Sequence, residues 1–126
     1  MKKIGCILIL LLIVFIFSAC EKIIDGGEID WFFTAKDYLE ELGSKIKFKL
    51  PPNKDGFSGA VWGTDVYSYD SAIGAAAVHA GVITLEAGGE VTIEILEGAS
   101  SYKGTTDNGI TTSDWGPYDY SYKFIK

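Results

Sequence analysis

Arginine is absent from this 126-residue sequence, histidine occurs once and cysteine twice. The 11 basic residues are therefore all lysines, and 17 acidic residues outnumber them, which gives a formal net charge of −6 at pH 7. Proteins that bind DNA or RNA need a basic surface, so this balance excludes nucleic acid as a partner. Zinc sites need clustered cysteine, histidine or carboxylate ligands, and with so few of the first two we expect no metal or other cofactor.

Long apolar segments are also absent, with one exception at the N-terminus. Lys2 and Lys3 precede residues 4–17, which form an uninterrupted apolar run. A membrane-spanning helix needs about 20 such residues, so this segment has the length of a signal-peptide core. Residues 17–20, with the sequence FSAC, then resemble the lipobox of bacterial lipoproteins.

We therefore expect residues 1–19 to be a signal peptide and Cys20 to be the lipidated first residue of the mature chain. The resemblance implies a diacylglycerol on the Cys20 thiol, cleavage before Cys20 and often a third acyl chain, and two or more chains give stable membrane anchoring. The alternative is an uncleaved N-terminal anchor with a chance cysteine. Glu21, in place of an aspartate, favours the outer membrane if the source is a Gram-negative bacterium. The expected location is thus the cell envelope.

Cleavage changes both the cysteine content and the charge. It removes Cys6, so Cys20 is the only cysteine left and no intramolecular disulfide can form, although the compartment is oxidising. It also removes Lys2 and Lys3, which leaves nine lysines against 17 acidic residues and a net charge of −8. This balance argues against a general attraction to anionic lipids as well.

Three segments of the mature chain alternate apolar and polar residues with a period of two, which is typical of strands with one buried face. They are residues 45–50, 91–95 and 118–124. Between the last two, residues 100–114 read as a polar loop region with an Asp-Asn-Gly turn at 107–109.

The chain before the first of these strands is less regular. Residues 20–30 are predicted to be the lipidated cysteine and a short tether, followed by a single domain over residues 31–126. Thr34 can cap a helix over residues 34–42. The aromatic run at 31–33 could equally be a strand.

A second helix is predicted over residues 72–80, where nearly every side chain is small and apolar. Asp70 and Ser71 are suited to cap its N-terminus, and Gly81 is suited to end it in the left-handed conformation. Apart from one histidine the helix has no polar side chain, and such a helix is usually buried all round. Gly74 costs roughly 1 kcal/mol relative to alanine in mid-helix, so we expect a neighbour that leaves no room for a side chain.

Residues 61–83 resemble the LCCL domain family, and the likeness extends over about residues 43–126. The motifs that carry it are VWGTDVY at 61–67, DS at 70–71, AAAVHAGVI at 75–83, GG at 88–89, YKG at 102–104, NGI at 108–110 and WG at 115–116. The resemblance implies an α+β fold, mostly β, in which a short central helix of small residues is wrapped by irregular antiparallel sheets. The cysteines usual in the family are missing, because Gly74 stands where a helix cysteine is expected and residues 50–53 contain none.

His79 is the only histidine in the sequence and therefore the only candidate for a histidine base in catalysis. A hydrolase would place it beside Ser71 and an acid, but on a helix these two positions are about 12 Å apart along the axis, too far for a hydrogen bond. We therefore expect His79 to be structural and to hold a strand or loop carbonyl at the helix end. Asp65, Asp70 and Asp107 lack the spacing of a calcium loop, and capping and turn roles explain the last two.

Lys45, Lys47 and Lys49 would lie on one face of the first strand. Such a row could dock phosphate-bearing glycans such as lipopolysaccharide or teichoic acid. Alternatively, the lysines protect an edge strand from aggregation. We favour the second interpretation because the chain as a whole is acidic.

The best candidates for contacting a ligand are Trp62, Trp115 and the tyrosines at positions 67, 69, 102, 118, 120 and 122. Sugars pack their C–H faces on such aromatic rings. Trp62, Tyr120 and Tyr122 are assigned to the core instead. Trp115 lies in the turn-rich run 113–117, and binding residues often lie in loops. The candidate ligand-binding residues are Tyr102, Asn108, Asp114 and Trp115. The residues expected to be structural are Asp70, Ser71, Gly74, His79 and Gly81.

The sequence thus favours a non-catalytic binding module of the cell envelope. Its expected partners are the membrane, through lipidated Cys20, and a glycan, a lipopolysaccharide-like glycolipid or another envelope protein. An alternative is a structural or scaffolding subunit that docks another envelope protein through exposed β edges. A hydrolase that uses Ser71 or an acid pair is a weaker third.

Overall fold

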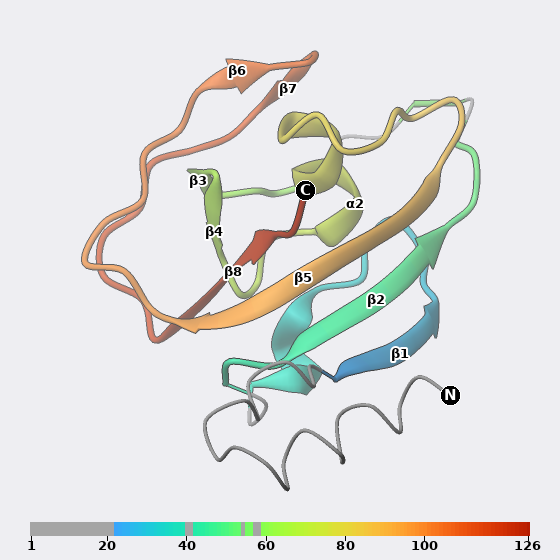
Figure 1. The fold of residues 1–126 in the computed structure, drawn as a ribbon. Helices are drawn as coiled ribbons and strands as arrows, with labels where there is room; N and C mark the ends of the chain where they lie inside the picture. Colours follow the sequence, from blue (N-terminus) through green and yellow to red (C-terminus); the bar gives the residue numbers. More distant parts are fainter. Residues whose placement is uncertain (1–21, 40–41, 54, 57–58) are drawn as a thin grey trace, which may run out of the picture.

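The computed structural model describes residues 22–39, 42–53, 55–56 and 59–126, whose arrangement is shown in Figure 1. Among the described residues strands dominate, with one short α-helix, so the predicted α+β, mostly β class is confirmed. The predicted signal peptide, residues 1–19, and Cys20 lie outside the described residues. The elements in chain order are β1 (Ile23–Glu28), η2 (Ala35–Tyr38), β2 (Lys45–Leu50), β3 (Gly63–Thr64), β4 (Val66–Ser68), α2 (Ile73–His79), β5 (Gly89–Glu97), β6 (Thr106–Asp107), β7 (Ile110–Thr111) and β8 (Tyr120–Phe124).

Six strands form one sheet in the order β1-β2-β5-β8-β4-β3, and β6 and β7 form a separate two-stranded sheet. Neighbours in the large sheet are antiparallel except β1 and β2, which run parallel. Helix α2 lies on one side of the large sheet, and the β6–β7 hairpin lies at the top of the view in Figure 1. Within the described part of the chain, no helix is both long enough and apolar enough to cross a membrane.

Strands β2 and β5 bury every second side chain, as the period of two predicts. The buried rows face each other in the register, with Ile46 opposite Ile93 and Phe48 opposite Val91. Burying one such side chain stabilises a fold by about 1.5–3 kcal/mol, so these rows form a large part of the core. The first two predicted strands are confirmed, and the third begins only at Tyr120.

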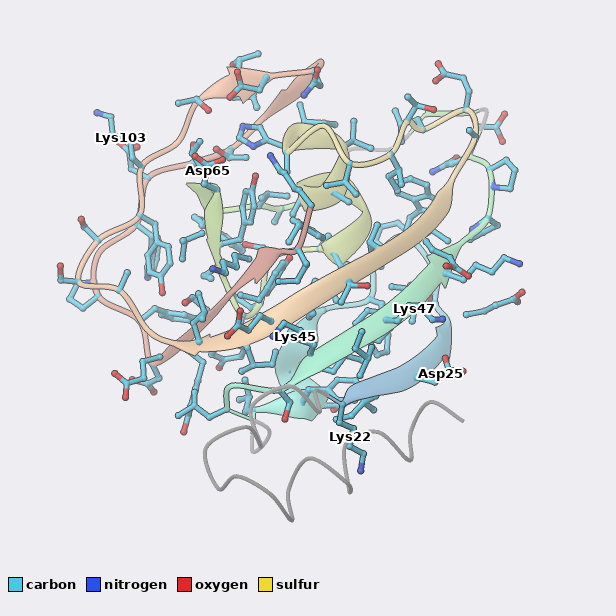
Figure 2. The ribbon with its side chains drawn as sticks, in the orientation of Figure 1. Lys22, Asp25, Lys45, Lys47, Asp65 and Lys103 are labelled. Carbon is cyan, nitrogen blue, oxygen red and sulfur yellow. The ribbon has the colours of Figure 1, made fainter. Side chains whose placement is uncertain are left out.

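The lysine-bearing face of β2 does not lie at an edge of the sheet. Strand β2 lies between β1 and β5, so the interpretation of its lysines as edge protection is wrong. Lys47 is the register partner of Asp25 in β1 (Figure 2), and Lys49 is that of Glu90 in β5. Opposite charges on neighbouring strands stabilise a sheet by about 0.2–1 kcal/mol. The lysines therefore alternate with carboxylates across the sheet and do not form a purely positive strip.

Strand β1 lies within residues 20–30, the segment predicted to be a tether. Because this strand pairs with β2, the sheet already includes residue 23, and the predicted domain boundary at residue 31 is wrong. Gly26 allows the two strands to pack closely, since a Cβ at this position would lie 2.3 Å from the ring of Phe48.

Helix α2 is buried on every side, from Ile73 to His79. Gly74 lies against an aromatic ring, because a Cβ there would be 2.3 Å from Cε3 of Trp31. Gly81 follows the helix with a φ of 80°, the left-handed conformation typical of a helix C-terminus. The helix is therefore enclosed by its neighbours rather than lying on the surface.

The N-terminus of α2 is not capped by side chains, so this part of the prediction is wrong. The N-cap residue is Ala72, and no side-chain cap hydrogen bond is present. Ser71 Oγ accepts instead from the backbone N–H of Trp62 at 2.9 Å, and Asp70 Oδ1 accepts from Ser68 Oγ at 2.6 Å. Both predicted caps are therefore used to fix the chain that leads into the helix.

The helix predicted over residues 34–42 is reduced to the short 3-10 helix η2 in the described residues. Thr34 is its N-cap, and its side chain accepts from a backbone N–H in the first turn. Trp31, which could have begun a strand, lies in a turn instead. Its indole Nε1–H donates to the carbonyl of Pro51 at 2.9 Å, which holds the ring in place beneath α2.

The β6–β7 hairpin interrupts the polar loop predicted for residues 100–114. Its two-residue turn consists of Asn108 and Gly109, with φ values of 52° and 82°. Positive φ at both central positions is the geometry that matches the twist of a tight hairpin. The predicted turn is therefore confirmed, and the two short strands beside it were not predicted.

Candidate ligand-binding surface

Trp115 is the most exposed tryptophan in the described residues, with 51% of its surface accessible. Its backbone is nevertheless fixed by two hydrogen bonds to Tyr102. The Trp115 N–H donates to the Tyr102 carbonyl at 2.9 Å, and the Tyr102 N–H donates to the Trp115 carbonyl at 2.8 Å. A ring held in this way loses little freedom when it contacts a ligand, which favours binding.

Trp115 is part of a row of five aromatic rings in which each ring contacts the next. Ring centroids are 6.1 Å apart between Trp62 and Trp115, and 6.5 Å apart between Trp115 and Tyr118. Tyr118 stacks on Tyr69 at 5.1 Å, and Tyr69 lies 6.3 Å from Tyr120. All five residues are at least partly exposed. We term Trp62, Tyr69, Trp115, Tyr118 and Tyr120 the aromatic row.

Three segments that are distant in the sequence form the aromatic row: the chain before β3, the turn after β4, and residues 115–120, which lead into β8 and include its first residue. The loop is bound to the chain before β3, because Ser113 N–H donates to the Val61 carbonyl at 2.9 Å and Gly63 N–H donates to the Ser113 carbonyl at 3.1 Å. Tyr69 N–H donates to the Tyr120 carbonyl at 3.1 Å where the end of β4 meets the start of β8 (Figure 1). Backbone hydrogen bonds therefore preform this surface.

A hydrogen bond fixes the tyrosine at the centre of the aromatic row. The Tyr118 hydroxyl donates to Asp70 Oδ2 at 3.0 Å, and the other oxygen of Asp70 accepts from Ser68. The hydrogen bond to Asp70, followed by desolvation, raises the pKa of Tyr118 to about 12. Tyr118 is therefore neutral at physiological pH, and its ring has a set orientation.

Two of the predicted ligand-binding residues support the Trp115 loop from within. Tyr102 is only 4% exposed, and its hydroxyl accepts from the Ala99 N–H at 3.0 Å. Asp114 is exposed, and its Oδ1 accepts from the Gly104 N–H at 2.7 Å. The Tyr102 side chain thus braces the loop after β5, whereas the Asp114 side chain links this loop to the loop before β8. Only Asp114 remains accessible beside Trp115.

The fourth predicted ligand-binding residue, Asn108, lies outside the aromatic row. It occupies the β6–β7 turn, and its Nδ2 donates to the carbonyl of His79 at 3.0 Å. There it borders a hollow of about 370 Å³ at the C-terminal end of α2, together with Val78 and residues 81–86. The structure thus brings Trp115 and Asp114 together and leaves Asn108 at a different place on the surface.

His79 is buried where α2, β4 and the β6–β7 hairpin meet. Its Nδ1 lies 2.9 Å from the Tyr67 hydroxyl, and its Nε2 lies 3.0 Å from Thr105 Oγ1 and 3.3 Å from the Thr105 carbonyl. Asp107 Oδ2 is 3.4 Å from Nε2. Both ring nitrogens therefore have partners in strands and loops around the helix end.

Ser71, the other residue of the hydrolase alternative, belongs to a separate hydrogen-bond network. Its Oγ contacts the Trp62 N–H and the Ser68 hydroxyl, and in the described part of the chain no hydrogen bond links Ser71 to His79. Among the residues that the structure describes, no three histidine, cysteine, aspartate or glutamate side chains lie close enough together to hold a metal ion.

The aromatic row includes residues that the sequence placed elsewhere. Trp62 and Tyr120 were assigned to the core, whereas both are only partly buried; Tyr122 is buried, as predicted. Tyr120 starts β8 at the end of the sheet, where less of the chain covers it. Tyr69 and Tyr118 were among the aromatic residues named as candidates for contacting a ligand, but neither was one of the four residues selected. Each lies next to a turn, and turns were the signal that pointed to Trp115.

The chain matches the family model of the LCCL domain over residues 29–122. It is 30% identical over 106 residues to clotting factor C of Tachypleus tridentatus, which covers 84% of this chain and 10% of that protein. It is 44% identical over 50 residues to human vitrin, covering 40% of this chain and 7% of that protein. It is 39% identical over 56 residues to human cysteine-rich secretory protein LCCL domain-containing 2, covering 44% of this chain and 11% of that protein.

The chain thus spans only about a tenth of these relatives, and the matched part is the domain itself. The matched residues include helix α2, strands β2, β3, β4 and β5 of the large sheet and the first part of β8. The family model covers well over half of the chain, so this protein belongs to the LCCL domain family.

Proposed function

We propose that this protein is a non-catalytic binding module of the cell envelope and that the aromatic row is its ligand-binding surface. The observation that carries the proposal is the continuous set of five rings, in which Trp115 is half exposed on a fixed backbone. A ligand that covers these rings removes apolar surface from water, which contributes roughly 25 cal/mol per Å².

A glycan is the ligand class that suits this surface best. One face of a sugar ring is lined with C–H groups that pack against aromatic rings, and its hydroxyls need hydrogen-bond partners at the edge. Asp114, beside Trp115, has an exposed carboxylate that can accept from a hydroxyl. We therefore propose an envelope glycan or a glycolipid, with lipopolysaccharide among the ligands to be tested.

The experiment is a binding screen of the chain from Glu21 onward against bacterial envelope glycans and lipopolysaccharides. We expect saturable binding that Trp115→Ala reduces at least tenfold. Phe32→Ala is the matched control, because Phe32 is an exposed aromatic residue, 70% accessible, that is not part of the aromatic row. The proposal is wrong if the folded protein binds none of these ligands or if both variants bind as the unchanged chain does.

We also propose that the protein is exported and anchored in the membrane through lipidated Cys20, in the outer membrane if the source is Gram-negative. The support is the order of the basic, apolar and FSAC segments at the N-terminus. Labelling cells with radioactive palmitate tests this proposal. The label should appear on the unchanged protein and be absent from Cys20→Ala, and equal labelling of both would refute lipidation.

A scaffolding subunit is the second candidate function, and the edge of the sheet favours it. Strand β1 is an edge strand of the large sheet. Ile23, in this strand, and Phe32, which follows the strand in the sequence, are 51% and 70% exposed. An edge strand can pair with a strand of another protein. Recovery of one stoichiometric envelope protein from membranes, lost with Phe32→Ala and retained with Trp115→Ala, would support this candidate instead.

A further inference from the structure

A second feature adjoins the aromatic row: a broad hollow of about 550 Å³ at the junction of β5 and β8. Tyr118 and Tyr120 belong both to the aromatic row and to the lining of this hollow. A ligand that lies on the row would therefore extend into the hollow without leaving the aromatic surface. The other lining residues are Leu42, Glu97, Gly98 and Asp119.

The backbone around the hollow is closely packed and fixed. Glu97 is the register partner of Tyr120, and the Gly98 N–H donates to the Asp119 carbonyl at 2.9 Å. A Cβ on Gly98 would lie 1.7 Å from the carbonyl oxygen of Tyr118, so only glycine allows the two segments to approach this closely. The backbone that carries Glu97 and Asp119 is therefore fixed where the two paired strands meet.

The charges around the hollow have one sign. Glu97 and Asp119 are both exposed, and no lysine is among the described residues that line the hollow. At the other end of the aromatic row, Asp114 adds a third carboxylate beside Trp115. Lys103 follows Tyr102 in the sequence, and its side chain points away from the body of the molecule (Figure 2).

This distribution discriminates between classes of glycan. A phosphate or a carboxylate in the hollow would face two like charges without a cation to offset them, which disfavours anionic sugars. An ammonium group would be attracted by both carboxylates and by the faces of the tyrosine rings. A neutral sugar would make the aromatic contacts and could donate its hydroxyls to the carboxylates, but it would gain no ion pair.

We propose that this hollow binds the protonated amino group of an amino sugar, so that the ligand of the aromatic row is a glycan with free amines. The inference rests on the proposed glycan-binding function and specifies its ligand class. It predicts a preference against phosphorylated glycans, although such glycans are common in bacterial envelopes.

The test compares oligomers of glucosamine with oligomers of N-acetylglucosamine of the same length, because the two differ only in whether the amine is free and charged or acetylated and neutral. Calorimetry with the chain from Glu21 onward should show the glucosamine oligomer binding about tenfold more tightly, the combined effect of one cation–π contact and exposed ion pairs. The preference for the glucosamine oligomer should decrease when salt is added, because salt screens the ion pairs. It should also decrease at a pH high enough to deprotonate the amine.

Glu97→Gln combined with Asp119→Asn should abolish the preference while leaving the N-acetylated oligomer bound as before. Glu90→Gln is the matched control, since Glu90 is an exposed carboxylate at the opposite end of β5. Unchanged thermal melting of each variant shows that the fold is retained.

The possible failures can be distinguished from one another. If both oligomers bind equally and both depend on Trp115, the inference about the amine is overturned and the glycan-binding proposal is supported. If the preference survives the double substitution, the hollow is not the amine site and the inference is again overturned. If neither oligomer binds, the inference about the amine is overturned. The proposed glycan-binding function is overturned as well only if the wider screen also finds no glycan that binds.

Discussion

Gly74 lets helix α2 pack closely against its neighbours because it has no Cβ. A Cβ would lie 2.3 Å from Trp31 and 2.9 Å from Leu50, both of which are buried. The indole of Trp31 is also held by its hydrogen bond to Pro51, so it cannot move aside without breaking that contact.

Gly74→Ala should therefore lower the free energy of unfolding by about 1–3 kcal/mol, because overpacking outweighs the better helix propensity of alanine. Urea denaturation measures this change. Gly116→Ala is the matched control, as a Cβ on Gly116 would meet nothing within 4 Å. Equal stability of the two variants would mean that the core has room at Gly74.

His79 is the second residue whose effect can be isolated. Replacing it with alanine leaves the buried Tyr67 hydroxyl without its partner, which should cost about 1–3 kcal/mol and lower the melting temperature. In the double variant with Tyr67→Phe, both partners of that hydrogen bond are gone. The double variant should therefore lose less stability than the sum of the losses in the two single variants. Strictly additive losses would show that this hydrogen bond contributes little.

At the scale of elements, the sequence predicted most reliably what depends on local pattern. The alternation in β2 and β5 and the all-apolar surface of α2 led to correct elements. The caps of α2 were wrong because Asp70 and Ser71 are bound by Tyr118 and Trp62, which are distant in the sequence. Strand β1 was missed for the same reason. Its glycines and charged residues are typical of a linker, and only its pairing with β2, which is distant in the sequence, makes it a strand.

The turn of the β6–β7 hairpin provides a prediction about an element. Gly109 has a φ of 82° and open space around it, so Gly109→Ala adds backbone strain and no steric clash. We expect a loss of about 1–2 kcal/mol. Hydrogen exchange should show faster opening of the hairpin amides, with the amides of β5 less affected. Unchanged exchange in the hairpin would contradict the left-handed turn.

At the scale of the whole molecule, the fold class and the family could be predicted from the sequence, whereas the aromatic row could not. The five rings come from three segments, and no local pattern shows that these segments meet. The match to the family begins at residue 29, so β1 lies outside it and extends the large sheet beyond the matched domain.

Three tyrosines with raised pKa values make the stability of the whole molecule depend on pH in the alkaline range. Burial raises the pKa of Tyr67 to about 12 and that of Tyr122 well above its usual value, while Asp70 raises the pKa of Tyr118 to about 12. The folded state therefore holds these protons more tightly than the unfolded state, whose tyrosines titrate at about pH 10.

Stability should be unaffected by these groups below about pH 10 and should fall as the pH rises from 10 to 12, because the unfolded state loses its protons first. Denaturant midpoints measured across this range, with tyrosinate absorbance recorded in parallel, test the prediction. A midpoint that stays constant up to pH 12 would contradict it.

The position of β1 has a consequence for how far the domain can reach. In a chain anchored at Cys20, three Cα–Cα steps separate the lipidated residue from Ile23, where the sheet begins, and they extend to at most about 11 Å. A domain anchored in this way rests against the membrane surface and cannot move far from it. With the anchor proposed above, only envelope molecules that come to the membrane surface can meet the aromatic row.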